Sequence, residues 1–309
     1  MNVTISKLCE NIEKVIVGKR EVIVNVIAAM LCEGHILIED VPGVGKTQLV
    51  SALAKSVDGK FNRIQLTPDI MPSDIVGFSM LDKDTGEFQY RSGAAMCNFL
   101  LADEINRASP KAQSSLLEVM EEHQISLDGK TFILPKPFMT LATQNPVETY
   151  GTYHLPEAQM DRFIIKISIG YPTKQDELEI LSRSEGNVVA SALTGVCSTD
   201  DIVALQEQVI KVTVSAQVRD YILNIVTATR NNEFIKLGAS PRGSIALLKM
   251  AKAVAFIDDR DYVTPDDVKK IMSSVLAHRI ILSPKGKSKF ETAEQAVEYV
   301  ASFVAVPIA

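Results

Sequence analysis

The first half of the chain alternates short apolar runs with helical patterns of apolar residues. Five runs are typical of buried strands: 36–38, 61–66, 98–102, 138–143 and 163–169. Helices are expected between them at 47–57, at 110–122 with a proline in the first turn, and near 156–160. This alternation predicts a mostly parallel five-stranded sheet flanked by helices, which places the first half of the chain in the α/β class.

Two insertions in this half have the pattern of β-hairpins. Residues 79–91 place the turn Lys83-Asp84-Thr85-Gly86 between two short segments, and residues 124–134 place Asp128-Gly129 between alternating apolar positions. An Asp-Gly pair in such a setting is a strong hairpin signal. Plain surface loops remain the alternative for both insertions.

The pattern changes after Tyr171, where glycines and β-branched runs become sparse and helical periodicity takes over. Helices are expected at 175–183, 199–211, 216–230, 241–257, 265–282 and 291–304. Thr264 and the Pro265 that follows it supply a cap residue and a first-turn proline for one of them. The sequence therefore predicts two domains: an α/β domain, residues 1–171, and an all-helical domain, residues 172–309.

Composition adds limits on partners and location. The chain has 309 residues, of which 46% are hydrophobic and 23% charged, as in ordinary soluble proteins with a sizeable core. A formal net charge of −6 argues against broad, charge-driven binding to nucleic acid or to anionic membranes. The four cysteines show no C-x-x-C spacing, so neither a zinc site nor a disulfide framework is indicated.

The two most informative segments for location are the N-terminus and the most apolar helical stretch. Residues 1–14 lack the basic start and apolar core of a signal peptide. Residues 22–32 are far shorter than the ~20 residues that a membrane-spanning helix needs. We therefore expect a cytoplasmic protein without membrane insertion.

Residues 39–47 form a glycine-bearing turn between an expected strand and an expected helix. Gly43 and Gly45 leave room for backbone N–H groups to converge on phosphate oxygens, while Lys46 and Thr47 suit the β/γ-phosphates and Mg²⁺. The positive end of the following helix dipole favours the same anion. Asp40 stands where the full G-x-x-x-x-G-K-[ST] pattern has glycine, so an accidental Gly-Lys-Thr at a helix start remains the alternative.

Polar groups follow two further strands. Asp103 and Glu104 end the apolar run 98–102, at the sheet edge where ligands bind in open α/β folds. One carboxylate of such a pair can hold the Mg²⁺ shell, and its neighbour can polarise a water for in-line attack on a phosphate. Asn145, after the run 138–143, suits the orientation of that water. A helix cap and an Asn-Pro turn are the corresponding structural alternatives.

Five motifs in this order resemble those of the MoxR family of AAA+ ATPases: 43–47, 103–108, 143–146, 155–163 and 240–243. The resemblance covers nearly the whole chain and implies a P-loop NTPase core followed by a helical lid domain. Asp40 fits it, because MoxR sequences often share this loop. The two hairpins then correspond to the helix-2 insert and the pre-sensor-1 hairpin of the clade that includes magnesium chelatases and minichromosome maintenance helicases.

The resemblance also implies roles for individual residues. Catalytic roles fall to Glu104, to Asn145, to Arg162 as an arginine finger reaching a neighbouring subunit, and to Arg242 as the sensor 2 of the same subunit's site. Mg²⁺ would be held by Thr47 and Asp103. The expected ATP-binding residues are Val17, Gly18, Pro42, Gly43, Val44, Gly45, Lys46, Thr47 and Gln48.

The leading functional hypothesis is a Mg²⁺-dependent ATPase that assembles into a homo-oligomeric ring, a hexamer, and remodels or matures a protein partner. The resemblance suggests that this partner contains a von Willebrand factor A domain. A nucleic-acid motor is the first alternative, but hairpin 124–134 carries only Lys130 as a base and also contains Asp128, so nucleic acid is disfavoured. A nucleotide-gated scaffold without hydrolysis is the second, and the occupied catalytic positions disfavour it. The basic stretch 285–289 is expected to be a solvated loop.

Overall fold

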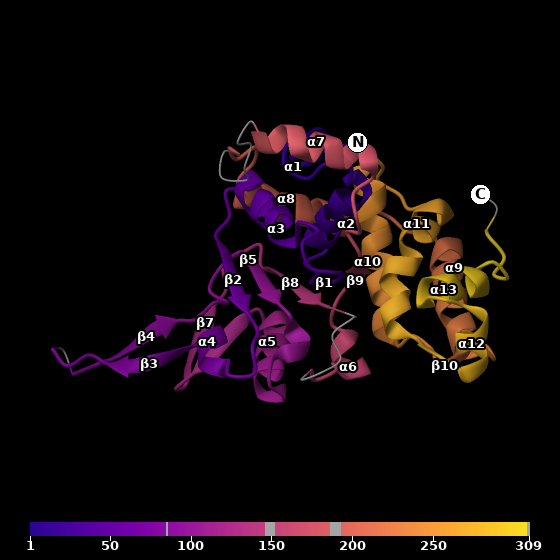
Figure 1. Ribbon diagram of the computed structural model, residues 1–309. Helices are drawn as coiled ribbons and strands as arrows, with labels where there is room; N and C mark the ends of the chain where they lie inside the picture. The colour runs from indigo at the N-terminus through magenta and orange to yellow at the C-terminus, as the bar shows by residue number, and fades with distance from the viewer. Residues whose placement is uncertain (85, 146–151, 186–192, 308–309) are drawn as a thin grey trace.

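The computed structural model describes residues 1–84, 86–145, 152–185 and 193–307. Its centre is a five-stranded sheet with the order β2-β5-β8-β1-β9, in which every pair of neighbours is parallel (Figure 1). The strands are β1 Ile36–Glu39, β2 Phe61–Gln65, β5 Phe99–Asp103, β8 Met139–Gln144 and β9 Ile165–Ile167. Each lies within or beside a predicted run, so the α/β prediction is confirmed.

Helices cover both faces of this sheet. Helices α1 (Val3–Glu13), α2 (Arg20–Leu31) and α3 (Lys46–Ser56) pack with Ile36 and Ile38 on one face. The short helix α4 (Pro72–Val76) and helix α5 (Pro110–Glu122) pack with Leu37 on the other. Successive residues of a strand point to opposite faces, which explains why an unbroken apolar run serves a sheet that is buried on both sides. Helix α6 (Glu157–Met160) precedes the last strand.

Both predicted hairpins are present. Strands β3 (Gly77–Leu81) and β4 (Phe88–Ser92) pair antiparallel and extend away from the body of the molecule (Figure 1). Strands β6 (Gln124–Leu127) and β7 (Lys130–Ile133) form the second hairpin. Its turn residues Asp128 and Gly129 have φ values of 51° and 74°, as the tightest hairpin turns require. Thr85 of the first turn lies outside the described residues.

The second half is mainly helical, as predicted. Its longer helices are α7 Lys174–Glu185, α8 Thr199–Ile210, α9 Ala216–Arg230, α10 Pro241–Ile257, α11 Pro265–Leu276 and α13 Ala293–Ala301. None of the helices in the described ranges is long and apolar enough to cross a membrane.

The prediction of one helix over 265–282 was wrong at its C-terminal end. Helix α11 stops at Leu276, and the 3₁₀ turn η3 (Ala277–Arg279) follows it. Strand β11 (Ile281–Leu282) then pairs antiparallel with β10 (Ile235–Leu237). The paired residues are far apart in the sequence, so local periodicity cannot predict this contact. The predicted loop at 285–289 lies instead in the short helix α12 (Pro284–Lys289), whose start is marked by the side chain of Ser283.

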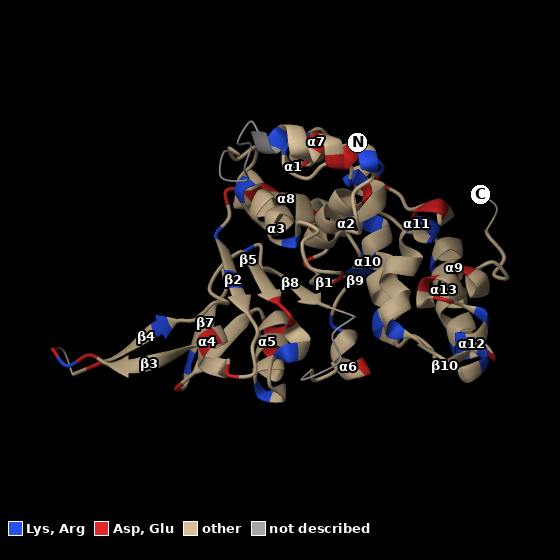
Figure 2. Ribbon diagram, viewed as in Figure 1, with Lys and Arg blue, Asp and Glu red and all other residues tan. Residues whose placement is uncertain are grey.

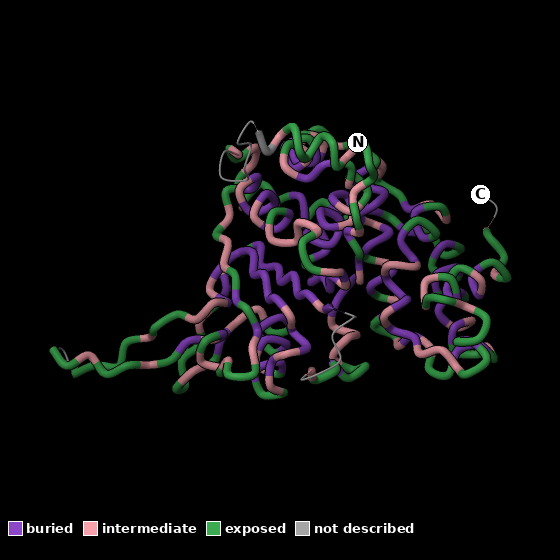
Figure 3. The backbone as a smooth tube through the Cα atoms, viewed as in Figure 1, coloured by how far each residue is buried: buried purple, intermediate pink, exposed green. Residues whose placement is uncertain are grey.

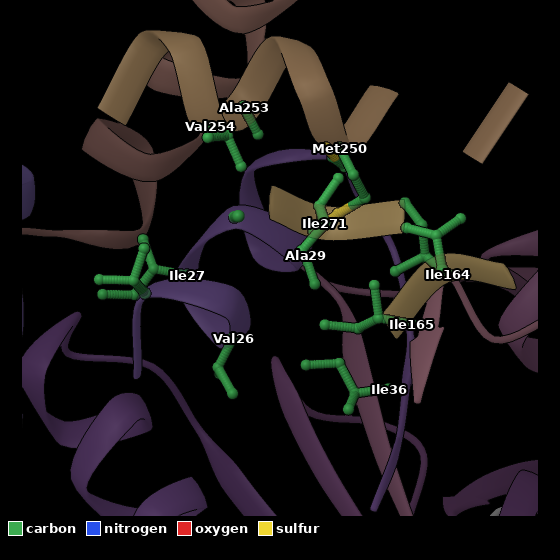
Figure 4. Packing of buried hydrophobic residues seen from close by; sticks show 14 of the residues in the cluster. Val26, Ile27, Ala29, Ile36, Ile164, Ile165, Met250, Ala253, Val254 and Ile271 are labelled. Carbon is green, nitrogen blue, oxygen red and sulfur yellow. The ribbon is translucent and has the colours of Figure 1, made fainter. Parts of the chain in front are cut away.

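The two halves share one hydrophobic cluster. Figure 4 shows Ala29 of α2, Ile165 of β9, Met250 of α10 and Ile271 of α11 around a common interior. In Figure 3 buried segments run from the sheet into these helices. The lid helix α10 is therefore fixed against the core, while the domain boundary after residue 171 stays a prediction.

Candidate functional site

A cavity of about 300 Å³ opens at the carboxyl edge of the sheet, where β1, β5 and β8 end. Nine of the predicted site residues line it: Pro42, Gly43, Gly45, Lys46, Thr47, Gln48, Asp103, Glu104 and Asn145. Three residues that were not predicted line it as well: Arg63, Gln65 and Thr143. Segments far apart in the sequence thus meet in one site because parallel strands present their carboxyl ends at the same edge.

The glycine turn of this cavity has the geometry of an anion cradle. Gly43 and Gly45 adopt φ values of 89° and 91°, which favour glycine, and a Cβ added at Gly43 would meet nothing within 4 Å. Helix α3 begins at Lys46, directly behind the turn. Open space in front of backbone N–H groups at a helix N-terminus fits the phosphates of a nucleotide.

The contacts of Asp40 explain why this position of the loop differs from the glycine of the full pattern. Asp40 is 6% exposed, and its carboxylate accepts hydrogen bonds from the backbone N–H groups of Ile169 and Gly170, just after β9. Its carbonyl oxygen accepts a hydrogen bond of 3.0 Å from Nζ of Lys46. Asp40 therefore ties the start of the phosphate loop to the neighbouring strand, a role that glycine has no side chain to perform.

Asp103 is the buried carboxylate of the cavity. Nε of Arg63 donates a hydrogen bond of 2.7 Å to its Oδ2, and the hydroxyl of Thr143 donates one of 3.1 Å to its Oδ1. Within the described residues there is no group of three or more His, Cys, Asp or Glu side chains that could hold a metal by themselves. Mg²⁺ commonly uses one or two protein oxygens together with phosphates and waters, and the oxygens of Thr47 and Asp103 fit that requirement.

Glu104 has an unusual backbone conformation. Its φ of 57° and ψ of 52° lie in the left-handed region, where residues other than glycine are uncommon and often functional. Its backbone N–H donates to the hydroxyl of Thr143 at 2.9 Å. Its Oε2 lies 2.8 Å from Nε2 of Gln65 and 3.1 Å from Nε of Arg107. The carboxylate is therefore held by two side chains at the wall of the cavity, and the buried Asn145 lies in the same wall.

The three missed residues carried a weak signal in the sequence. Arg63 and Gln65 interrupt the apolar run 61–66 at alternate positions, and β2 pairs with β5 so that Gln65 lies opposite Asp103. Polar residues at the end of an expected strand beside a catalytic strand could have been included on that ground. Thr143 was part of the motif at 143–146 but was not selected; Pro146 of that motif lies outside the described residues.

Three other predicted residues do not line the cavity. Val44 packs against the hydrophobic core, and Val17 is buried. Gly18 has a φ of 69° and lies so close to helix α7 that an added Cβ would come within 2.3 Å of Cγ of Asp176. The start of α7 therefore packs against Gly18, one of the residues expected to bind ATP.

Arg162 and Arg242 lie at a second cavity, of about 210 Å³, and neither lines the first one. Both pair with the carboxylate of Glu121 on α5: Nε of Arg162 lies 2.9 Å from Oε2, and a terminal nitrogen of Arg242 lies 2.6 Å from Oε1. Arg242, expected as the sensor 2 of its own subunit's site, thus lies beside Arg162 and not in the wall of the cavity at the phosphate loop. Helix α10 packs against α2 and α11, which directs its N-terminus toward Arg162.

His35 forms part of the wall of this second cavity. Its Nδ1 accepts a hydrogen bond from the backbone N–H of Thr140 at 3.0 Å, and its Nε2 lies 2.8 Å from the carbonyl oxygen of Met120. Burial lowers the pKa of His35 to about 4, and the acceptor role of Nδ1 requires the same neutral ring. His35 is therefore a structural group that joins α5 to the sheet.

Comparison with known proteins gives consistent results. Residues 35–165 match the protein family described as "ATPase family associated with various cellular activities (AAA)", and residues 227–300 match the AAA lid domain. The chain is 48% identical over 304 residues to the uncharacterized protein YeaC of Bacillus subtilis, covering 98% of this chain and 95% of YeaC. It is 40% identical over 313 residues to the chaperone MoxR1 of Mycobacterium tuberculosis, covering 98% of this chain and 82% of MoxR1.

A solved structure shows the same architecture over the whole length. It is a crystal structure from Cytophaga hutchinsonii of a protein assigned as an ATPase, with a TM-score of 0.91 and 39% sequence identity. The alignment covers 99% of this chain and 95% of that chain. Both the core and the lid therefore have counterparts in a single related protein.

Proposed function

The chain belongs to the MoxR family of AAA+ ATPases, and on this premise we propose that it hydrolyses ATP with Mg²⁺ in a ring whose active sites lie between subunits. One observation carries the proposal: the two arginines that would stabilise the transition state lie at a different cavity from the phosphate loop. A complete site then needs the loop of one subunit and the arginines of the next.

Within the first cavity each residue has a chemical task. Lys46 and the backbone of the glycine turn bind the phosphates. Thr47 and Asp103 would hold Mg²⁺, which would supply positive charge to the phosphate oxygens. Glu104 accepts a proton from the attacking water, and Asn145 orients that water. Gln65 and Arg107 hold Glu104 at the wall of the cavity until it is needed.

The second cavity supplies the remaining charge to a neighbour. Two guanidinium groups beside each other, at Arg162 and Arg242, provide permanent charge and planar donors for the oxygens of a terminal phosphate. An arginine finger supplied in trans is worth ~10³ to 10⁵ in rate. A head-to-tail contact between unlike faces closes into a ring if its rotation permits, and we propose a hexamer.

The partner that we propose is a protein that contains a von Willebrand factor A domain. We propose the cytoplasm as the location of the chain. The relative from Mycobacterium tuberculosis is named a chaperone. Phe78, Met80 and Phe88 of the projecting hairpin are 50%, 44% and 67% exposed, and acidic and basic residues are mixed at its tip (Figure 2). Exposed apolar side chains with mixed charges favour a polypeptide over a nucleic-acid backbone.

The test uses two substitutions at the two cavities. Glu104→Gln removes the proton acceptor, and Arg162→Ala removes the finger, while both leave the glycine turn intact. We expect both variants to bind ATP with near-normal affinity, measured by calorimetry, and to lose at least ~10²-fold in turnover. Near-normal turnover in either variant contradicts the role assigned to that residue.

A further inference from the structure

Arg279 is a buried cation beside the proposed finger, in the 3₁₀ turn η3. Its side chain is 2% exposed. A guanidinium so far from water is costly unless its donors are paired, and removal of the partners would leave a buried charge. The partners of Arg279 therefore show which segment its charge is used to fix.

The guanidinium of Arg279 bonds to the chain on both sides of Arg162. Its NH2 group donates to the carbonyl oxygens of Asp161 and Phe163 at 3.1 and 2.6 Å, and its NH1 group donates to that of Ile164 at 3.1 Å. Its Nε donates to Oδ1 of Asp161 at 2.8 Å. Four hydrogen bonds to three residues fix the backbone from which the Arg162 side chain projects.

Asp161 extends this network to the second arginine. Its other carboxylate oxygen, Oδ2, accepts a hydrogen bond of 2.6 Å from the hydroxyl of Ser240. Ser240 is the N-cap of helix α10, and its Oγ also accepts a hydrogen bond of 3.0 Å from the backbone N–H of Arg242. The positions of Arg162 and Arg242 are thus joined through one carboxylate.

The sequence leaves space for this arrangement at Gly243. A Cβ added there would lie 3.3 Å from Cδ of Arg279 and 3.2 Å from Cβ of Ala239. Contacts this short are tighter than ordinary van der Waals packing. The absence of a side chain at Gly243 lets the stem of Arg279 pass beneath the first turn of α10.

We propose that Arg279, acting through Asp161 and Ser240, is a positioning residue that sets the two trans-acting arginines as one rigid unit. The inference rests on the proposed function, because it gives Arg162 and Arg242 a shared target on the neighbouring subunit. Arg279 touches no substrate itself. A misplacement of catalytic groups by about 1 Å can cost ~10² in rate, so the geometry of the pair matters as much as its charge.

The test is a mixing experiment that separates the two faces of a subunit. Glu104→Gln subunits donate intact arginines but do not hydrolyse, so in excess they restore turnover to Arg162→Ala subunits assembled with them. Arg279→Lys keeps the charge but loses the planar fork that holds three carbonyl groups. Alone it should lose about 10²-fold in kcat with unchanged ATP affinity, and excess Glu104→Gln should restore its turnover as it does for Arg162→Ala.

Two controls separate positioning from general damage to the lid. Arg260→Lys is the matched change, because Arg260 also pairs with an aspartate of the lid, Asp267, through two hydrogen bonds of 2.8 and 2.6 Å. It should keep full turnover. Ser240→Ala removes the hydroxyl that joins Asp161 to the N-cap of α10 and should lower kcat by about 10-fold. Ser240→Thr keeps that hydroxyl and should keep kcat near normal.

The outcomes distinguish the inference from the proposed function. If Glu104→Gln subunits fail to restore Arg162→Ala, the arginines do not act in trans and the proposed function is wrong. If they restore Arg162→Ala but Arg279→Lys keeps full turnover alone, or is not restored, the positioning role is refuted and the proposed function stands. Should Arg279→Lys not fold, Ser240→Ala decides, and unchanged kcat in that variant refutes the inference.

Discussion

Removal of the Glu121 carboxylate should favour the assembly of subunits into the active oligomer. Glu121 pairs with Arg162 at 2.9 Å and with Arg242 at 2.6 Å, and both pairs must break before the arginines reach a neighbour's phosphate. The three side chains are 37%, 30% and 51% exposed, so solvent screening limits each pair to ~0.5 kcal/mol. Glu121→Gln then removes a competing interaction of ~1 kcal/mol, which is a factor of about 5 in an equilibrium constant.

The assay is specific ATPase activity across a dilution series at saturating ATP. We expect the protein concentration that gives half-maximal specific activity to fall about 5-fold in Glu121→Gln. Glu122→Gln is the matched control, because Glu122 is exposed on the same helix and its substitution changes the charge in the same way. Lower activity of Glu121→Gln at every concentration, or an equal shift in Glu122→Gln, would refute the competition.

Three further predictions concern the core. Gln65→Ala should raise ATP turnover, measured without a partner protein, about 5-fold and leave ATP affinity unchanged. The reason is that the loss of one hydrogen bond of ~1 kcal/mol frees the Glu104 carboxylate. A lower rate would show that Gln65 instead aligns Glu104 for catalysis. Asp40→Gly restores the consensus loop, yet the free energy of unfolding in urea should fall by ~2 kcal/mol or more, because two hydrogen bonds to the carboxylate disappear. Asp40→Asn should lower the free energy of unfolding by less. Acidification from pH 7.5 to 5 should lower the free energy of unfolding by ~2 kcal/mol through His35, because its pKa of about 4 lies below the unfolded value of 6.5 and the unfolded chain then binds more protons. His35→Gln should show a smaller decrease.

The sequence predicted the sheet well because its signal is local. Strands β1, β5, β8 and β9 are largely buried, so each appears as an apolar run. Asp103, Glu104 and Asn145 lie at or just after the ends of such runs. The hairpin at Asp128 was predicted from its Asp-Gly turn and from the alternating apolar positions on either side of that turn. Motif order then supplied the family, which the comparisons confirm.

What the sequence did not predict depends on contacts between distant segments. The sequence around Arg242 does not indicate that α10 packs against α2. That packing places Arg242 beside Glu121 instead of the phosphate loop. The end of α11 depends likewise on the pairing of β11 with β10. Arg63 and Gln65 gain their roles only because β2 lies beside β5, which chain order alone does not specify.

The central claim is that a complete active site needs two subunits, and the specific ATPase activity of the unmodified protein as a function of its concentration tests it most directly. The assay should span the transition from monomer to assembly, followed in parallel by light scattering. Activity per subunit should be near zero in the monomer and rise together with assembly, because Arg162 and Arg242 lie away from their own phosphate loop. Constant activity per subunit down to the monomer would contradict the account.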